Sequence, residues 1–327
     1  MLTTETALTI CCWLNVSRSF LHSKLKTDAK RLMGGFMFSG VYTALITPFK
    51  DYKVDFDAFE KLIENQYKKG VNGIVPCGTT GESPTLSCKE HEEVIEFCVE
   101  KAKGKMKVLA GTGSNSTDEA IYFTRTAKRV GCDGVLVVSP YYNKPTQKGL
   151  YLHFKTIADT IDIPIVLYNI AGRTSINIEP ATVAKLFKNC KNIIGVKEAS
   201  GSLDQMSAIK SLVPDIELIS GDDALTLPLL SIGGIGVISV LSNIIPTEIV
   251  SLVKTFEKGD LKEAVKIHYK LLPLVKLMFI ETNPIPVKTV ASLLGMCSAD
   301  LRLPMCEMEE PNRLKLEKAL KDFGLLK

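Results

Sequence analysis

From residue 40 onward, short apolar runs alternate with longer segments in which apolar residues recur at the spacing of an α-helix. Segments such as "DAFEKLIENQYKKG" and "SCKEHEEVIEFCVEKAKG" predict amphipathic helices, and their closing glycines are typical helix stops. The apolar runs, bounded by turn residues, predict eight strands. These runs are "VYTALITP", "GIVPCG", "VLAGTG", "GVLVVSP", "PIVLYN", "IIGVKE", "ELISGD" and "GVISV".

Strands that are apolar on both faces and separated by helices indicate a parallel sheet. Eight strand–helix units favour an α/β fold, the closed (β/α)8 TIM barrel. An open, doubly wound sheet is the alternative, although no strand opens a GxGxxG loop and neither "GTTGE" nor "GTGSN" has the lysine of a P-loop. Helical sequence continues to the end of the chain. We therefore expect a catalytic barrel over residues 37–260 and a C-terminal helical domain over 261–327.

Residues 1–36 do not share this pattern. They contain five Lys or Arg and only two acidic residues. Three interpretations compete: a disordered tail, translated sequence upstream of a natural start at Met37, or a basic targeting segment such as a plastid transit peptide. Because the apolar part precedes the basic part, a secretion signal is disfavoured. We favour the first two interpretations.

Overall charge and the cysteine and histidine content narrow the class of protein. Lys and Arg number 40 against 36 Asp and Glu, without blocks of one sign, so neither nucleic acid nor a membrane surface is an expected partner. Nine cysteines without a CxxC pair favour reduced thiols and a cytoplasmic protein. The four histidines include no i, i+4 pair, which predicts that there is no transition-metal site. We expect a small-molecule ligand.

In a TIM barrel, the active site forms where the strands end. Hydroxyl groups gather at the predicted strand ends, together with one lysine and, shortly after the fifth strand, Arg173. The polar residues at the ends of strands two to seven are, in order, Thr79, Thr80 and Glu82; Thr112, Ser114 and Asn115; Tyr141 and Tyr142; Tyr168 and Asn169; Lys197 and Glu198; Asp222 and Asp223.

Lys197 ends the apolar run of "NIIGVKEASGS". An amine withdrawn from water loses its proton more readily and can attack a ketone to form a Schiff base. Tyr168, on the preceding strand, could shuttle protons, with Thr79 or Thr80 completing the relay, and Arg173 could bind a carboxylate. Single lysines at strand ends are usually solvated, so these residues alone leave other barrel lyases, isomerases and phosphate-binding enzymes open. Glu198 should point away from Lys197, because neighbours on a strand face opposite sides.

Seven motifs in fixed order resemble the dihydrodipicolinate synthase family of the N-acetylneuraminate lyase superfamily. They are "GTTGES", "AGTGSN", "PYYNKP", "LYNIAGRT", "GVKEASG", "SGDDA" and "GVISV". The resemblance runs from about Met37 to the final helix. It implies a (β/α)8 barrel with C-terminal helices, usually a homotetramer built as a dimer of dimers. It also implies a lyase of lysine (diaminopimelate) biosynthesis that condenses pyruvate with L-aspartate 4-semialdehyde and uses neither metal nor organic cofactor.

The resemblance also implies roles for individual residues. Lys197 matches the residue that forms the Schiff base with pyruvate, and Tyr168 matches the proton donor and acceptor. Thr79 and Tyr142 match the rest of the relay, with Tyr142 reaching into the site of a partner subunit. The substrate-binding positions are Thr80 and Ile238 for pyruvate and Arg173 for the carboxylate of the aldehyde substrate.

Some members of the family are inhibited by lysine. The positions that match their effector site are Ser83, Pro84, Cys88, His91, Asn115, Glu119 and Tyr141. Cys88 and Pro84 depart from the residues frequent in the family, whereas the last four positions are retained. The resemblance therefore implies an allosteric site for L-lysine.

Two other functions fit parts of the pattern. N-acetylneuraminate lyase shares the lysine and the tyrosine, but the second threonine of "GTTGE" and Arg173 favour the synthase. A barrel without activity that senses lysine or a keto acid belongs to a different class, and the combination of Lys197, Tyr168 and Thr79 disfavours it.

Overall fold

The computed structural model describes residues 35–327. The chain divides into two units, Met1–Ser39 and Gly40–Lys327. Residues 1–34 lie outside the described residues, and with them almost all of the segment interpreted above as a tail, an upstream extension or a transit peptide. The account that follows concerns the second unit.

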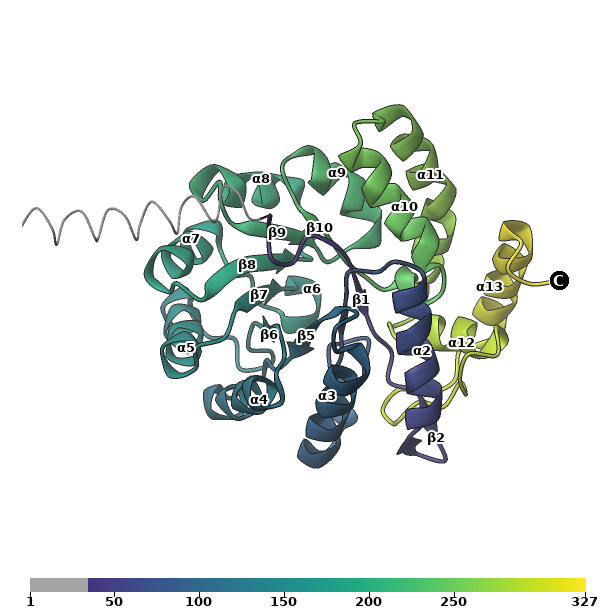
Figure 1. Cartoon of the computed structure of the whole chain (residues 1–327), viewed down its shortest axis with the longest axis horizontal. Helices are drawn as coiled ribbons and strands as arrows, with labels where there is room; N and C mark the ends of the chain where they lie inside the picture. Colours follow the sequence, from purple (N-terminus) through teal and green to yellow (C-terminus); the bar gives the residue numbers. More distant parts are fainter. Residues whose placement is uncertain (1–34) are drawn as a thin grey trace, which may run out of the picture. The chain divides into compact units, whose positions relative to one another are not determined.

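Eight parallel strands close into a barrel in the order β1-β10-β9-β8-β7-β6-β5-β4, which confirms the TIM barrel and excludes the open sheet (Figure 1). β1 pairs with both β10 and β4, and these two pairings close the ring. Every predicted strand is present. The strands are β1 (Gly40–Ala44), β4 (Gly73–Val75), β5 (Lys107–Gly111), β6 (Gly134–Val138), β7 (Ile165–Asn169), β8 (Ile193–Glu198), β9 (Glu217–Ser220) and β10 (Gly236–Ser239).

Helices follow the strands and surround the barrel (Figure 1). They are α2 (Phe56–Lys68), α3 (Cys88–Ala102), α4 (Thr117–Val130), α5 (Gln147–Thr160), α6 (Ala171–Thr174), α7 (Pro180–Asn189), α8 (Leu203–Leu212), α9 (Thr226–Ser231) and α10 (Pro246–Glu257). Polar caps define where several of them begin. At α3, Ser87 accepts a hydrogen bond from the amide of Glu90, whose carboxylate accepts one from the amide of Ser87, so two otherwise unpaired donors are satisfied.

The C-terminal helices are α11 (Leu261–Leu277), α12 (Ile285–Leu293) and α13 (Glu310–Phe323). α11 packs against α10, and α13 packs against both α11 and α12 (Figure 1). The predicted helical appendage is therefore confirmed. The boundary between residues 260 and 261 remains a prediction, because α10 and α11 form one packed pair.

Two local features differ from the sequence patterns. A short antiparallel hairpin, β2 (Phe49–Lys50) and β3 (Lys53–Val54), follows the first strand and was not predicted. The "STDE" segment predicts a capping box, but only half of it forms. Ser116 caps α4 by accepting from the amide of Glu119, whereas the Glu119 carboxylate accepts the hydroxyl of Ser114. Glu119 is thus turned toward the loop that ends the third barrel strand.

Candidate active site

Lys197 lies near the end of β8 and points into the barrel, where only 6% of its surface is exposed. Gly221, after β9, makes room for it: a β-carbon at that position would lie 3.0 Å from Cε and 3.2 Å from Cγ of Lys197. The glycine of "SGDD" therefore serves close packing against the lysine stem. The lysine is buried, contrary to the usual solvated position of a lysine at a strand end.

Tyr168 is the register partner of Lys197 on the neighbouring strand β7. The lysine Nζ lies 4.2 Å from the centre of the tyrosine ring. Parallel pairing with β8 places the two side chains at the same height in the barrel, because register partners in a sheet share a face. An amine and a phenol are thus neighbours inside the barrel.

One small cavity above the strands is lined by five of the predicted residues: Thr79, Thr80, Tyr168, Arg173 and Lys197. Two further lining residues, Phe279 and Asn283, come from the segment between α11 and α12. Sequence reasoning missed both, because no pattern in the appendage shows that it reaches the mouth of the barrel. The C-terminal helices therefore help to build the candidate site.

Arg173 lies on the single turn of α6, directly after β7. One of its terminal nitrogens donates a hydrogen bond to the backbone carbonyl of Asn283 at 3.0 Å. The amide of Asn283 in turn donates to the hydroxyl of Thr80, also at 3.0 Å. Asn283 thus joins the guanidinium on one side of the cavity to the threonine on the other.

Glu198, left without a role by the sequence, is fully buried and faces away from the cavity, as predicted for a neighbour of Lys197. Its carboxylate accepts hydrogen bonds from the side chains of Asn169 at 3.0 Å and Gln205 at 2.9 Å, and from the amide of Ser200 at 2.7 Å. Gln205 belongs to α8. These bonds fasten the end of β8 to the helix that follows, which supports the position of Lys197.

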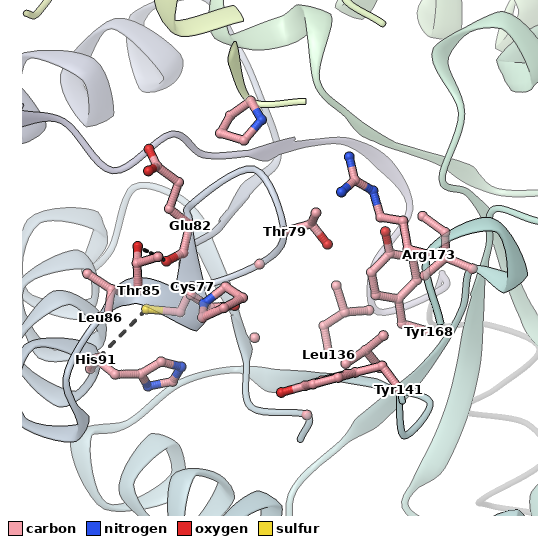
Figure 2. Close-up of a pocket in the computed structure, with 18 of the residues that line it drawn as sticks. Cys77, Thr79, Glu82, Thr85, Leu86, His91, Leu136, Tyr141, Tyr168 and Arg173 are labelled. Carbon is pink, nitrogen blue, oxygen red and sulfur yellow. Dashed lines mark hydrogen bonds between the residues drawn. The ribbon is translucent and has the colours of Figure 1, made fainter. Parts of the chain in front are cut away.

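A larger cavity of about 390 Å³ opens beside the first. Thr79, Tyr168 and Arg173 line both cavities. Figure 2 shows Tyr168 and Arg173 on one side of the larger cavity, His91 on the other, and Thr79 between them. Six predicted effector residues line it: Ser83, Pro84, Cys88, His91, Glu119 and Tyr141. The catalytic and effector candidates therefore line two adjoining cavities.

His91, on α3, is 5% exposed, and burial lowers the pKa of its imidazole to about 4. The ring is therefore neutral at physiological pH and can offer one donor and one acceptor. Its centroid lies 4.0 Å from that of Phe123 on α4. The neutral imidazole and the Glu119 carboxylate are two polar groups in the lining of the larger cavity.

Three predicted site residues do not line either cavity. Tyr142 is 89% exposed and has a positive φ of 71°. Asn115 lies in the loop after β5, where its backbone carbonyl accepts a hydrogen bond from the Asn143 side chain at 2.8 Å. Ile238 is fully buried in β10, paired with Tyr42 of β1. In this single chain, none of the three residues lies in the wall of either cavity, so their roles remain predictions.

The loop from Cys77 to Leu86 carries the threonines at one end and effector candidates at the other. Between them, Glu82 is 3% exposed and adopts a left-handed backbone conformation with φ of 54°. Its carboxylate pairs with the amine of Lys288 on α12 at 2.6 Å and accepts the amide of Arg302 at 3.2 Å. A buried ion pair between Glu82 and Lys288 of α12 thus holds this loop against the C-terminal helices.

Within residues 35–327, no helix is long and apolar enough to cross a membrane. Over the same residues, no group of three or more His, Cys, Asp and Glu side chains is arranged to hold a metal ion. The polar groups at the mouth of the barrel include a buried amine, a neighbouring phenol, two threonine hydroxyls and a guanidinium. These are the groups with which a barrel lyase that forms a Schiff base could work.

Comparison with known proteins agrees with this class. The model of the dihydrodipicolinate synthetase family matches residues 37–323. The 4-hydroxy-tetrahydrodipicolinate synthase of Methanococcus vannielii is 55% identical over 288 residues, covering 88% of this chain and 99% of that protein. The chain therefore belongs to the dihydrodipicolinate synthetase family, and it is a lyase with 4-hydroxy-tetrahydrodipicolinate synthase activity.

Solved structures show the same relationship. The crystal structure of dihydrodipicolinate synthase from Aquifex aeolicus has a TM-score of 0.87 and 51% identity, covering 88% of this chain and 99% of that one. The synthase from Cyanidioschyzon merolae, solved with lysine bound, has a TM-score of 0.87 and 44% identity, covering 89% of this chain and all of that one (100%). The alternative of a barrel without activity is thereby set aside.

Proposed function

We propose that Lys197 forms the Schiff base with pyruvate and that the resulting enamine attacks L-aspartate 4-semialdehyde. The observation that carries this proposal is the buried amine of Lys197 beside the ring of Tyr168. Attack of the amine on the ketone expels water and leaves an iminium, which withdraws electrons from the adjacent methyl group. Loss of a proton from that methyl group gives the enamine, the carbon nucleophile that attacks the aldehyde.

Tyr168 is proposed to move the protons of these steps, with Thr79 as its relay partner. Both line the small cavity that contains Lys197. Thr80 lines the same cavity, and because its oxygen accepts the Asn283 amide, its own proton is left to bind the carboxylate of pyruvate. Ile238 is proposed to meet pyruvate through its backbone.

Arg173 is proposed to bind the carboxylate of the aldehyde substrate. The guanidinium is a rigid, permanently charged fork that suits a carboxylate. It lines both cavities, so it can hold a substrate that enters through the larger one and reacts in the smaller. The proposed chemistry is carried by protein side chains alone, with no metal and no organic cofactor.

The choice of substrate tests this function against that of N-acetylneuraminate lyase. With pyruvate, the protein should turn over aspartate 4-semialdehyde and should not cleave N-acetylneuraminate, because Arg173 beside Lys197 suits the carboxylate of a short aldehyde rather than a long polyhydroxylated chain. Steady-state assays with each substrate decide the matter. Cleavage of the sialic acid without condensation of aspartate 4-semialdehyde would overturn the proposal.

Tyr142 is proposed to complete the proton relay in a second subunit, as part of a homotetramer. Its exposed side chain, on a strained backbone, suits a residue that projects from one chain toward another. Tyr142→Phe should lower kcat by at least about tenfold while the pyruvate adduct still forms, because general acid–base steps are lost but the amine remains.

The control for that variant is Tyr269→Phe on α11, where the tyrosine is 65% exposed. Its kcat should match the wild type. Full activity of Tyr142→Phe would refute the shared site. A monomer at assay concentration, measured by light scattering, would refute the proposed tetramer.

Lysine is proposed to bind in the larger cavity as an inhibitor. Glu119 can receive an ammonium group and neutral His91 can hydrogen-bond to either end of the zwitterion. The lysine-bound Cyanidioschyzon merolae synthase is a relative for which such a ligand is recorded. Asn115 is proposed to join this site from the adjoining loop.

Glu119→Gln should raise the lysine concentration for half-inhibition by about tenfold or more, because the negative charge that strengthens the hydrogen bond to the ammonium is lost. Glu96→Gln, an exposed change of the same kind on α3, is the matched control. Inhibition curves for both variants measure the effect. Equal sensitivity of the two variants would place the lysine site elsewhere.

The cytoplasm is the proposed compartment. This proposal is supported by similar synthases that come from an archaeon and a bacterium, Methanococcus vannielii and Thermodesulfovibrio yellowstonii. Fractionation of the source cells, followed by detection with an antibody, tests this proposal.

A further inference from the structure

The side chain of Asn283 has a buried oxygen that accepts no hydrogen bond from the described residues. The residue is 4% exposed, and its side-chain oxygen has no hydrogen-bond partner among the described residues. Asn283 lines both cavities at the mouth of the barrel. A buried acceptor without a partner costs about 1–3 kcal/mol, and one that lines a reaction cavity is placed to accept a hydrogen bond from a molecule bound there.

The other hydrogen bonds of Asn283 define which atom is free. Its amide nitrogen donates to the Thr80 oxygen at 3.0 Å, and its backbone carbonyl accepts from Arg173 at 3.0 Å. The amide nitrogen and the backbone carbonyl are therefore engaged, and the side-chain oxygen alone remains to accept a hydrogen from a bound molecule.

Asn283 and Arg173 line the same two cavities, and this shared position indicates what the free oxygen would bind. In an α-amino acid, the ammonium group is attached to the carbon next to the carboxylate. A site for such a molecule needs a carboxylate donor and an ammonium acceptor side by side. Arg173 supplies the donor. Asn283, whose backbone carbonyl accepts a hydrogen bond from Arg173, supplies the acceptor through its side-chain oxygen.

We infer that Asn283 is a specificity-determining residue for the proposed condensation, whose side-chain oxygen accepts a hydrogen bond from the α-ammonium of aspartate 4-semialdehyde. This inference rests on the proposed function and names the group that recognises the amino end of its second substrate. Arg173 and Asn283 together then distinguish an amino-acid aldehyde from an aldehyde with only a carboxylate.

A neutral amide suits this task better than a carboxylate. Pyruvate contributes no nitrogen, so the ring nitrogen of the product must come from the amino group of the aldehyde substrate. That group must lose a proton before it can close the ring. An amide oxygen orients the ammonium without the strong stabilisation of its charged form that an adjacent carboxylate would give.

The test compares aspartate 4-semialdehyde with succinate semialdehyde, which has the same carboxylate and aldehyde but no amino group. The measured quantity is the ratio of the inhibition constant of succinate semialdehyde to the KM of aspartate 4-semialdehyde. Asn283→Ala should lower this ratio by about tenfold or more, because only the amino-bearing ligand loses a charge-assisted hydrogen bond. Asn283→Asp, which places a carboxylate where the amide oxygen was, should keep the ratio at or above the wild-type value, because a carboxylate attracts the ammonium more strongly than an amide does.

A purely structural role would change the binding of both aldehydes alike, so an unchanged ratio in Asn283→Ala would overturn the inference. Should that variant fail to fold, the wild-type protein alone still decides, because equal affinity for the two aldehydes contradicts the proposed contact. Borohydride trapping of pyruvate is measured in parallel. Loss of the wild-type adduct would refute the proposed function, whereas an intact adduct with an unchanged ratio refutes this inference only.

Discussion

Replacing Lys197 with alanine should lower kcat by roughly 10⁴-fold or more, because no other lysine among the described residues lines the cavity to form the iminium. The expectation rests on burial and position: the amine is enclosed in the barrel, over the ring of Tyr168, in a cavity with Thr79, Thr80 and Arg173. Steady-state kinetics with pyruvate and aspartate 4-semialdehyde measure the loss.

The chain offers a matched control for this variant. Lys185 on α7 also lies over a tyrosine ring, with its Nζ 4.3 Å from the centre of Tyr151, but its side chain is exposed. Lys185→Ala removes the same atoms and a similar ring contact outside the barrel. It should leave kcat unchanged. Equal losses in the two variants would show that the effect of Lys197→Ala is not catalytic.

Removing one partner of the buried Glu82–Lys288 pair should lower the free energy of unfolding by about 3–5 kcal/mol, because the remaining charge is left without compensation. The Lys288 side chain is 0% exposed and that of Glu82 is 2% exposed. Lys288 also stacks over Phe49, with Nζ 4.3 Å from the ring centre. Urea unfolding of Glu82→Gln, Lys288→Met and the double variant measures the pair as a thermodynamic cycle.

The double variant should be less destabilised than the sum of the single variants, since it leaves neither charge unpaired. Glu64→Gln, which breaks the exposed Lys68–Glu64 pair, is the control and should leave the unfolding midpoint nearly unchanged. A Glu82→Gln midpoint equal to that of the control would contradict the account of this loop.

The effect of pH on Glu82→Gln has a definite sign. Burial lowers the pKa of Lys288 below 10.5, and Glu82 opposes this shift. Without Glu82, the folded protein should bind the lysine proton more weakly than the unfolded chain does. Stability should therefore rise as the pH increases through the lowered folded-state pKa toward 10.5.

Local pattern was sufficient to predict the barrel, because each strand is an apolar run bounded by turn residues and each helix has its own period and caps. The same rules placed Lys197 and Tyr168 on neighbouring strands, and parallel pairing then makes them register partners. The opposite orientation of Glu198 also followed from strand geometry alone.

Contacts between segments far apart in the chain could not be predicted in this way. Asn283 meets Thr80 across 203 positions, and Lys288 meets Glu82 across 206. Nothing in the local sequence of "TNPIPVK" shows that it reaches the mouth of the barrel. The Glu119 carboxylate turns to Ser114 because the end of β5 is nearby in space, which a capping pattern does not encode.

The central claim is that Lys197 is the nucleophile, and reduction with borohydride in the presence of pyruvate tests it most directly. Reduction converts the iminium to a stable secondary amine, so the mass of the intact protein should increase by one reduced pyruvate per chain. Peptide mapping should place that mass on Lys197, and Lys197→Ala should show none. No gain in mass, or a gain mapped to another lysine, would contradict the account.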